Sequence, residues 1–336
     1  MQVRHIPIFV PHKGCPHDCV FCNQRHITGH IKDTTPGDVI RIIEENLATI
    51  SSDTYIEAAF FGGSFTAIDM EQQTELLKAA YTYVKDGKIS GIRCSTRPDC
   101  INEEILQNYK RYGGIAIELG VQSTDEEVLK KSHRGHSFGD VVKAAQLIKQ
   151  AGIELGVQMM LGLPGDTEDK MLKTARDLIS LNPVCVRLYP TLVVEDTALW
   201  NMYHSGMYTP LSVEKATDIL SVIIPMFKNA GVDVIRVGLQ TTDEINENTV
   251  KGPYHPAIKE LAMGRIVRNV ICEYIHFAQN GILEVFCNPR EVSIVSGHKR
   301  CNKDYFKSEY NAELKILPLD NLNCGELKIH DKIVAF

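Results

Sequence analysis

The stretch Cys15-Pro16-His17-Asp18-Cys19-Val20-Phe21-Cys22 places three cysteines in a CxxxCxxC spacing near the start of the chain. Three thiolates on one short loop can hold three irons of a cubane [4Fe–4S] cluster and leave the fourth iron open for another ligand. The same cysteines with a nearby histidine could instead bind structural zinc. Structural zinc usually takes its ligands from two separated pairs, and no second pair follows, so the spacing favours the cluster.

Apolar strand-like runs alternate with helix-like segments on both sides of this stretch. Residues 6–10 predict a first strand that leads into the cysteine loop, and Thr35-Pro36 predicts the start of a helix that runs to about residue 50. Five more units follow, with strands predicted at 56–61, 92–95, 115–119, 153–160 and 184–189, and helices at 70–84, 103–112, 140–151, 168–180 and up to 202. Six βα units in series predict a parallel α/β sheet, either open or closed into a partial barrel.

The last third of the chain changes character. A helix at 212–229, a strand at 232–237 and a helix at 257–272 are predicted first. Short strands at 283–286, 292–295, 314–317 and 326–329, with one helix at 302–310, then predict a small α+β appendage. We therefore expect one domain over residues 1–275 and a smaller domain over residues 276–336.

Composition limits the class of protein. The chain has 336 residues, 44% hydrophobic residues and a formal net charge of -6, which argues against a generally basic nucleic-acid binder. The seven cysteines outside the triplet are scattered singly, which predicts reduced and mostly buried thiols. No signal-peptide pattern and no membrane-spanning apolar run is visible, so we expect a cytoplasmic protein without membrane contact.

The triplet, with aromatic Phe21 directly before its last cysteine, resembles the signature of the radical S-adenosylmethionine superfamily. This resemblance implies a partial (β/α)6 barrel of the TIM type, a [4Fe–4S] cluster on Cys15, Cys19 and Cys22, and S-adenosylmethionine bound to the open iron at the C-terminal ends of the strands. It also implies reductive cleavage of the cofactor, hydrogen abstraction from a substrate by the 5′-deoxyadenosyl radical, and a reductant such as flavodoxin or ferredoxin.

Motifs at later strand ends match the same superfamily in order. Gly62-Gly63-Ser64 resembles the glycine motif that contacts the methionyl amino group, and the GLPG turn at 162–165 resembles the turn beneath the adenine. Ser95 lies in a segment similar to ETRPD and stands where many relatives have glutamate. Gln158 is a polar amide in an apolar strand, which predicts a hydrogen-bonded partner such as a ribose hydroxyl. The residues expected to contact the cofactor are Phe21, Gly62, Gly63, Ser64, Ser95, Gln122, Arg134 and Gln158.

Further polar residues lie on or near the later strands. Glu118 in a buried strand suggests a ligand contact, and Arg187 could pair with Glu118 or face the cofactor carboxylate. Three residues are candidates for either substrate contact or a structural role: Arg236, Tyr254 and His255. Four residues around Arg134 are expected to form a solvated basic turn: Lys130, Lys131, His133 and His136.

The TRPD segment at 96–99 and the YPT segment at 189–191 resemble the catalytic subunit of Elongator, so tRNA is the substrate that this resemblance suggests. We expect no counterpart of that subunit's acetyltransferase domain in this shorter sequence, since no glycine-rich pyrophosphate turn follows residue 282. Two alternatives stay open. One is a small-molecule radical enzyme similar to coproporphyrinogen oxidase, and the other is a non-catalytic iron–sulfur or zinc-binding module.

Overall fold

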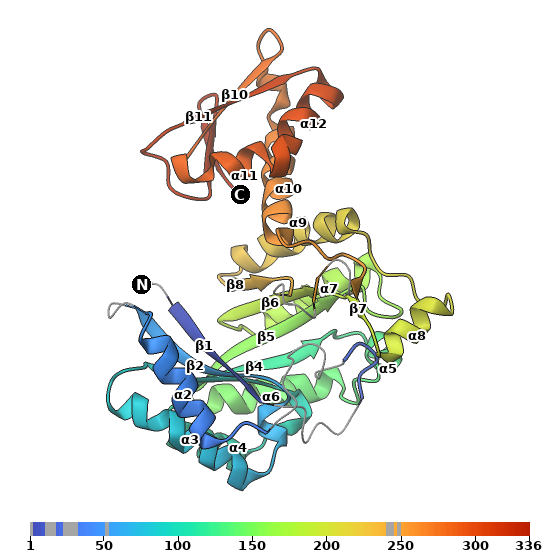
Figure 1. Ribbon diagram of the computed structural model, residues 1–336. Helices are drawn as coiled ribbons and strands as arrows, with labels where there is room; N and C mark the ends of the chain where they lie inside the picture. Colours follow the sequence, from blue (N-terminus) through green and yellow to red (C-terminus); the bar gives the residue numbers. More distant parts are fainter. Residues whose placement is uncertain (1–2, 11–17, 23–32, 51–53, 240–244, 247–249) are drawn as a thin grey trace.

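A computed structural model describes residues 3–10, 18–22, 33–50, 54–239, 245–246 and 250–336. Its main element is a seven-stranded sheet in the order β1-β2-β3-β4-β5-β6-β8, in which every neighbouring pair is parallel (Figure 1). The strands are β1 (Val3–Val10), β2 (Tyr55–Gly62), β3 (Gly91–Thr96), β4 (Gly114–Gln122), β5 (Glu154–Leu161), β6 (Cys185–Pro190) and β8 (Asp233–Val237). The predicted parallel α/β sheet is confirmed.

The sheet curls into a partial barrel. Strands β2 and β6 are four positions apart in the order, which in a flat sheet is about 19 Å. Nevertheless the guanidinium of Arg187 on β6 lies 4.8 Å from the ring centre of Phe61 on β2. Strands β2 and β6 therefore bend toward each other, and the side chains on the concave face meet inside a space that we call the lumen.

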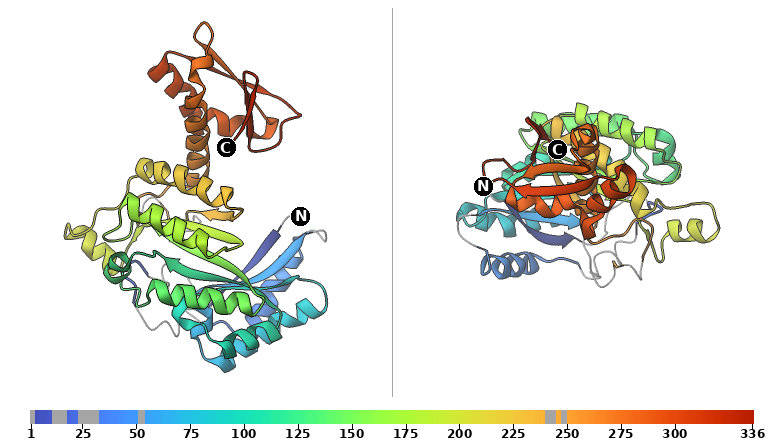
Figure 2. Two further views of the ribbon diagram at one scale, coloured as in Figure 1. Left: turned by 180° about the vertical axis from the view of Figure 1, so that it is seen from behind. Right: turned by 90° about the horizontal axis from the view of Figure 1, so that it is seen from above.

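Helices cover the convex face (Figures 1 and 2). They are α2 (Pro36–Leu47), α3 (Met70–Lys85), α4 (Glu103–Arg111), α6 (Phe138–Gln150), α7 (Glu168–Ser180) and α9 (Val213–Asn229), with two shorter helices, α5 (Glu126–Lys131) and α8 (Ala198–His204), in the connections. Thr35 caps α2 in a capping box with Asp38, as the Thr-Pro signal predicts. Alternate strand residues such as Ile6 and Ile8 are fully buried beneath these helices.

A two-stranded antiparallel ribbon, β7 (Val193–Val194) with β9 (Val250–Lys251), was not predicted. Each strand has only two residues, too few for a periodic signal. The ribbon packs with Leu192 and Ile245 into a small cluster of its own. Because β7 directly follows β6, the ribbon lies beyond the C-terminal end of the sheet.

The appendage has a second sheet in the order β11-β10-β12-β13, with β10 parallel to β11 and antiparallel to β12. Its elements are α10 (Ile258–Glu273), β10 (Ile282–Cys287), α11 (Val292–Ser296), α12 (Cys301–Tyr310), β11 (Glu313–Pro318), β12 (Glu326–Ile329) and β13 (Lys332–Ala335). Short 3₁₀ turns lie at Phe65–Ala67, Pro98–Cys100, Ile275–Phe277, Pro289–Glu291 and His298–Arg300. Figure 2 shows the appendage beyond α9 and β8, away from β1 to β4.

The strand predicted at 292–295 is wrong, because this segment is helix α11. Its β-branched residues favour a strand locally, but both edges of β10 are already taken by β11 and β12. The segment instead buries Val295 as a helix that follows the 3₁₀ turn starting at Pro289.

Helix α10 belongs to both hydrophobic cores. Ile258, Ala262 and Ile266 pack into the core of the partial barrel, whereas Val267 and Ile271 pack into the core of the appendage. The domain boundary expected at residue 275 falls just after this shared helix and stays a prediction.

Two smaller expectations can be compared with the structure. No helix in the described part of the chain is long and apolar enough to cross a membrane. Among the scattered cysteines that the structure describes, Cys94, Cys185 and Cys287 are buried but Cys301 and Cys324 are exposed, so not all of these thiols are buried.

Candidate functional site

The described part of the cysteine loop forms a tight turn at the C-terminal mouth of the barrel. The amide of Cys22 donates to the carbonyl of Cys19 at 3.0 Å, which places two of the three predicted ligands on one turn. Cys15 lies outside the described residues, and among those described no cluster of three or more metal-binding side chains is found. The described turn is therefore compatible with the predicted set of three cysteine ligands, which stays a proposal.

Two other loops anchor this turn through the backbone of Val20. The Val20 amide donates to the carbonyl of Ser132 at 3.2 Å, and the Val20 carbonyl accepts from the amide of Leu199 at 2.7 Å. Ser132 ends helix α5 after β4, and Leu199 lies in α8 after β6. Segments that follow the C-terminal ends of two strands thus fix the position of the cysteine turn.

Arg134 is the main polar contact of the Cys19 side chain. Its Nη1 donates to Cys19 Sγ at 3.1 Å, and Nη1 of Arg97 reaches the same sulfur at 3.9 Å. Arg134 also donates to the carbonyl of Gly120, and its guanidinium lies 6.0 Å from the ring centre of Phe21. The signature aromatic residue and the predicted cofactor-binding arginine therefore meet beside the buried thiol.

These surroundings fit an iron–sulfur ligand. Two guanidinium groups contact one buried sulfur, and hydrogen bonds to the ligand sulfurs are a usual feature of iron–sulfur sites. Gln122 at the end of β4 has a positive φ of 71°, and its buried Oε1 has no hydrogen-bond partner in the described part of the chain. A buried acceptor without a donor is what a polar cofactor group would satisfy.

The end of β2 lies directly against the end of β1. Gly62 has a φ of +99°, and a Cβ atom added to it would lie 2.8 Å from the carbonyl oxygen of Val10. The amide of Gly63 donates to that same carbonyl at 2.9 Å, and Ser64 is buried. Only glycine fits at position 62. The chain entering the cysteine loop at Val10 is therefore held by the predicted glycine motif.

Ser95 and Gln158 lie on the lumen face near Glu118. Ser95 is in register with Glu118 across β3 and β4 and is buried. Nε2 of Gln158 donates to Oε2 of Glu118 at 3.2 Å. A carboxylate accepts only, so the NH₂ group of Gln158 must face it and the amide oxygen is left for another donor. The predicted ribose contact of Gln158 is compatible with this orientation and stays a prediction.

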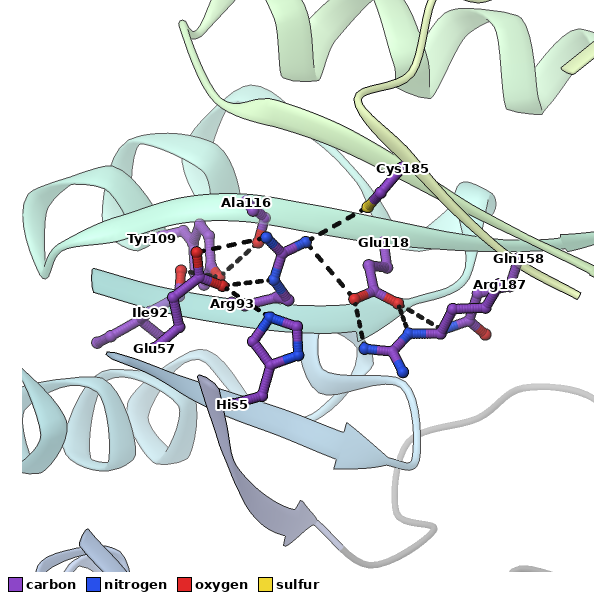
Figure 3. Close-up of polar contacts among 10 residues, drawn as sticks. All are labelled: His5, Glu57, Ile92, Arg93, Tyr109, Ala116, Glu118, Gln158, Cys185 and Arg187. Atoms are coloured by element: carbon purple, nitrogen blue, oxygen red, sulfur yellow. Dashed lines mark hydrogen bonds and ion pairs between the residues drawn. The ribbon is translucent and has the colours of Figure 1, made fainter. Parts of the chain in front are cut away.

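The lumen contains a buried network of charged side chains (Figure 3). Arg187 donates through Nε and Nη2 to the two oxygens of Glu118, at 2.5 and 3.0 Å. Arg93 lies 3.5 Å from Glu118 and donates from Nε to Glu57 at 2.6 Å, and His5 lies 3.3 Å from Glu57. Of the two roles open to Arg187, pairing with Glu118 is the one observed.

This network is as buried as an apolar core, since Glu118 is 0% exposed and Glu57 is 3% exposed. Burial opposes the ionisation of Glu57, but hydrogen bonds from His5 and Arg93 outweigh it and keep the pKa of its carboxyl below the usual value. The sequence prediction did not single out Glu57 or Arg93. Their signal is the one that marked Glu118, a charged residue inside an otherwise apolar strand.

The turn after α5 is only partly solvated. Lys130, Lys131 and His133 are exposed as predicted. His136 is only 6% exposed, so the prediction that its side chain is solvated was wrong. Burial, followed by the nearby cations Arg134 and Arg97, lowers the pKa of His136 to about 3. The imidazole is therefore neutral at physiological pH, beside the arginines that contact Cys19.

The three substrate-contact candidates do not gather at one point. Arg236 is half-buried on β8, and its Nε donates to the carbonyl of Gly238 at 3.2 Å. His255 accepts from the amide of Ala257 at 3.0 Å, and its ring centre lies 5.3 Å from that of His298 in the appendage. Tyr254 is half-buried in the loop after β9.

Comparison with known families matches most of the chain. The model of the Radical SAM superfamily matches residues 9–178, and that of the Radical_SAM C-terminal domain matches residues 183–268. Among curated proteins, the tRNA uridine(34) acetyltransferase of Methanocaldococcus jannaschii is 32% identical over 186 residues, covering 49% of this chain and 34% of the relative. Human Elongator complex protein 3 is 28% identical over 218 residues, covering 62% and 38%. The chain spans little more than a third of the length of these relatives.

Solved structures share the fold. The archaeal Methanocaldococcus infernus Elp3 with an N-terminal deletion superposes with a TM-score of 0.62 at 23% identity, over 80% of this chain and 63% of that chain. Methylornithine synthase superposes with a TM-score of 0.50 at 17% identity, over 81% and 82%. These likenesses support the partial barrel.

Proposed function

Since this chain belongs to the radical S-adenosylmethionine superfamily, we propose that it is an Elongator-like radical enzyme that acts on tRNA. The superfamily uses a [4Fe–4S] cluster and S-adenosylmethionine as cofactors, and the bound pair supplies a one-electron cleavage that yields a hydrogen-abstracting radical. The proposal adds the substrate class and the residues of this chain that would hold the two cofactors.

The contact of Arg134 and Arg97 with the buried thiol of Cys19 is the observation that carries the proposal. Cys15, Cys19 and Cys22 would hold the cluster. The residues that would hold S-adenosylmethionine beside it are Phe21, Gly62, Gly63, Ser64, Ser95, Gln122, Arg134 and Gln158.

The buried charges of the lumen are compatible with radical chemistry because they are paired with one another. The lumen wall pairs both buried carboxylates with arginines, so Glu57 and Glu118 present no unpaired charge. A hydrogen-bonded wall gives a reactive species few unintended partners. Glu118 also fixes the orientation of the Gln158 amide, so the lumen orients as well as encloses.

Two observations support tRNA as the substrate. Curated relatives at 32% identity are tRNA uridine(34) acetyltransferases, although this chain covers only about a third of them. In addition, the appendage has a basic turn at His298–Arg300. The ring of His298 in this turn contacts the ring of His255 in the loop after β9. Lys299 and Arg300 are exposed there, which gives an overall acidic chain a local positive surface for phosphates.

The first experiment tests the radical activity. Protein reconstituted anaerobically with iron and sulfide should form 5′-deoxyadenosine from S-adenosylmethionine when dithionite, or a flavodoxin or ferredoxin system, supplies electrons. The Cys19→Ala variant should lose both the iron and the product. Cys324→Ala changes an exposed thiol far from the triplet in sequence and serves as the matched control. Full iron content in Cys19→Ala would contradict the ligand assignment.

The second experiment tests the tRNA part alone. Binding of total tRNA should weaken steeply as salt rises, and exchange of both Lys299 and Arg300 for glutamate should reduce that slope by about two, one for each lost phosphate contact. Transfer of deuterium from labelled tRNA into 5′-deoxyadenosine would identify it as the substrate. If tRNA binds no better than a neutral polymer, the tRNA assignment is abandoned and the radical activity is judged separately.

A further inference from the structure

Arg236 carries a positive charge on the lumen face that no carboxylate balances in the described part of the chain. Strand β8 pairs with β6 so that Arg236 lies opposite Arg187, and paired residues of neighbouring strands point to the same face. Arg187 points into the lumen, where it reaches Glu118. Arg236 is half-buried and has one recorded contact, from Nε to the carbonyl of Gly238, which leaves its terminal nitrogens available.

The carboxylates and the other arginines of Figure 3 are already paired. Figure 3 shows Glu57 bound by Arg93, and Glu118 bound by Arg187 with Arg93 nearby. Two buried carboxylates thus meet two buried arginines. Arg236 is a third arginine on the same face without a carboxylate among the described residues. A half-buried cation in this position is stabilised when an anion joins it.

A second donor lies next to Arg236. Tyr189 is two residues after Arg187 on β6 and therefore faces the same side. Burial raises the pKa of the Tyr189 hydroxyl, and the nearby cations Arg187 and Arg236 only partly offset this, so the group stays a neutral O–H donor. Two residues further, Thr191 is 1% exposed and its hydroxyl has no hydrogen-bond partner in the region described. The pairing of β6 with β8 thus brings hydrogen-bond donors near an arginine that has no carboxylate partner among the described residues.

We propose that Arg236, with Tyr189, binds a phosphate group carried by the substrate. The terminal nitrogens of an arginine and a neutral hydroxyl are suited to the oxygens of a phosphate. The competing source of an oxyanion is the carboxylate of S-adenosylmethionine. Arg134 is the arginine proposed for the cofactor, and it follows β4, which β5 and β6 separate from β8. The phosphate assignment rests on the proposed function, in which the substrate is tRNA.

The test compares uridine 5′-monophosphate with uridine as probes of the reconstituted protein loaded with S-adenosylmethionine. Isothermal titration calorimetry and ³¹P line broadening measure binding to the wild type, Arg236→Gln, Arg236→Lys and Arg41→Gln. Arg41 is an exposed arginine of α2 that pairs with Glu45, so its variant controls for a general loss of positive charge. Thermal unfolding of each variant checks that the fold is retained.

The proposal expects the monophosphate to bind the wild type more tightly than uridine, by about tenfold or more, which is about 1.4 kcal/mol. Arg236→Gln should remove this preference, Arg236→Lys should retain part of it, and Arg41→Gln should leave it intact. Affinity for S-adenosylmethionine should stay within about twofold in all variants.

Two results would overturn the proposal. One is equal binding of the monophosphate and uridine to the wild type, and the other is a tenfold loss of S-adenosylmethionine affinity in Arg236→Gln, which would assign the charge to the cofactor carboxylate. Neither readout uses tRNA or product formation. A protein that does not bind tRNA but prefers the monophosphate would therefore refute the tRNA part of the proposed function and still support the phosphate site.

Discussion

Arg134 Nη1 donates a hydrogen bond to the Sγ of Cys19 across 3.1 Å, which joins the loop after β4 to the loop after β1. The same guanidinium also donates to the carbonyl of Gly120 at the end of β4. One arginine therefore connects the proposed cluster ligand with the strand that ends in Gln122. This connection explains how residues that are more than 100 positions apart in the chain are held together at the C-terminal end of the barrel.

The first prediction concerns this arginine. Arg134→Gln should still bind iron, because the cysteines remain, but should bind S-adenosylmethionine at least about tenfold more weakly, a loss of about 1.4 kcal/mol. Arg134→Lys keeps the charge without the planar fork and should recover only part of the affinity. Iron content and equilibrium binding of S-adenosylmethionine measure the two effects. An unchanged affinity in the glutamine variant would remove Arg134 from the cofactor site.

The second prediction concerns the lumen network. Glu118→Ala should lower the free energy of unfolding by about 3–5 kcal/mol, because it leaves Arg187 buried without a partner. Adding Arg187→Met should restore much of that loss, since Arg93 still has Glu57. Urea unfolding of the two single variants and the double variant forms a cycle that isolates the pair. Purely additive losses would show that Arg187 and Glu118 are not coupled.

The third prediction concerns pH. The pKa of His136 is lowered to about 3 in the folded chain, whereas a histidine in an unfolded chain has a pKa near 6.5. A histidine with a depressed pKa adds stability that is present above about 6.5 and is lost as the pH falls toward the folded value. From about pH 7.5 to about pH 5.5, the cluster-free wild type should lose about 1.4 kcal/mol more than His136→Gln. Denaturant titrations at both pH values measure this, and parallel losses would exclude a buried neutral His136.

The fourth prediction concerns the glycine that touches the start of the cysteine loop. Gly62→Ala should be destabilised by more than about 1 kcal/mol, the usual cost of a left-handed alanine, because the new Cβ would also meet the Val10 carbonyl. Gly87→Ala also has a positive φ but no atom within 4 Å, so it is the matched control. Gly62→Ala should in addition take up less iron. Equal iron content and stability in the two variants would contradict the close packing at Val10.

The sequence predicted the repeating part of the fold because each βα unit carries its own local signal. The strand that leads into the cysteine loop and the N-cap at Thr35 are examples, and each depends on residues within a few positions. Segment 292–295 was predicted wrongly because its outcome depends on the distant strands β11 and β12, which occupy both sides of β10. Local preference cannot report which edges are already filled.

The candidate site likewise has residues that local motifs predict and residues whose role depends on distant contacts. Gln122, Gly62 and the cysteines could be found from motifs, and the structure brings Cys19 and Arg134 into contact. The burial of His136 could not be found, since it depends on how the turn after α5 packs against the cysteine turn. The pairing of Arg93 with Glu57 required knowledge of which strands are neighbours.

Helix α10 has a consequence for how the molecule unfolds. Because Ile266 packs into the barrel core and the next residue, Val267, packs into the appendage core, neither core can lose this helix without weakening the other. The two parts should therefore melt in a single cooperative transition. A chain cut after residue 275 would leave Val267 and Ile271 facing water, and it should self-associate through that apolar stripe.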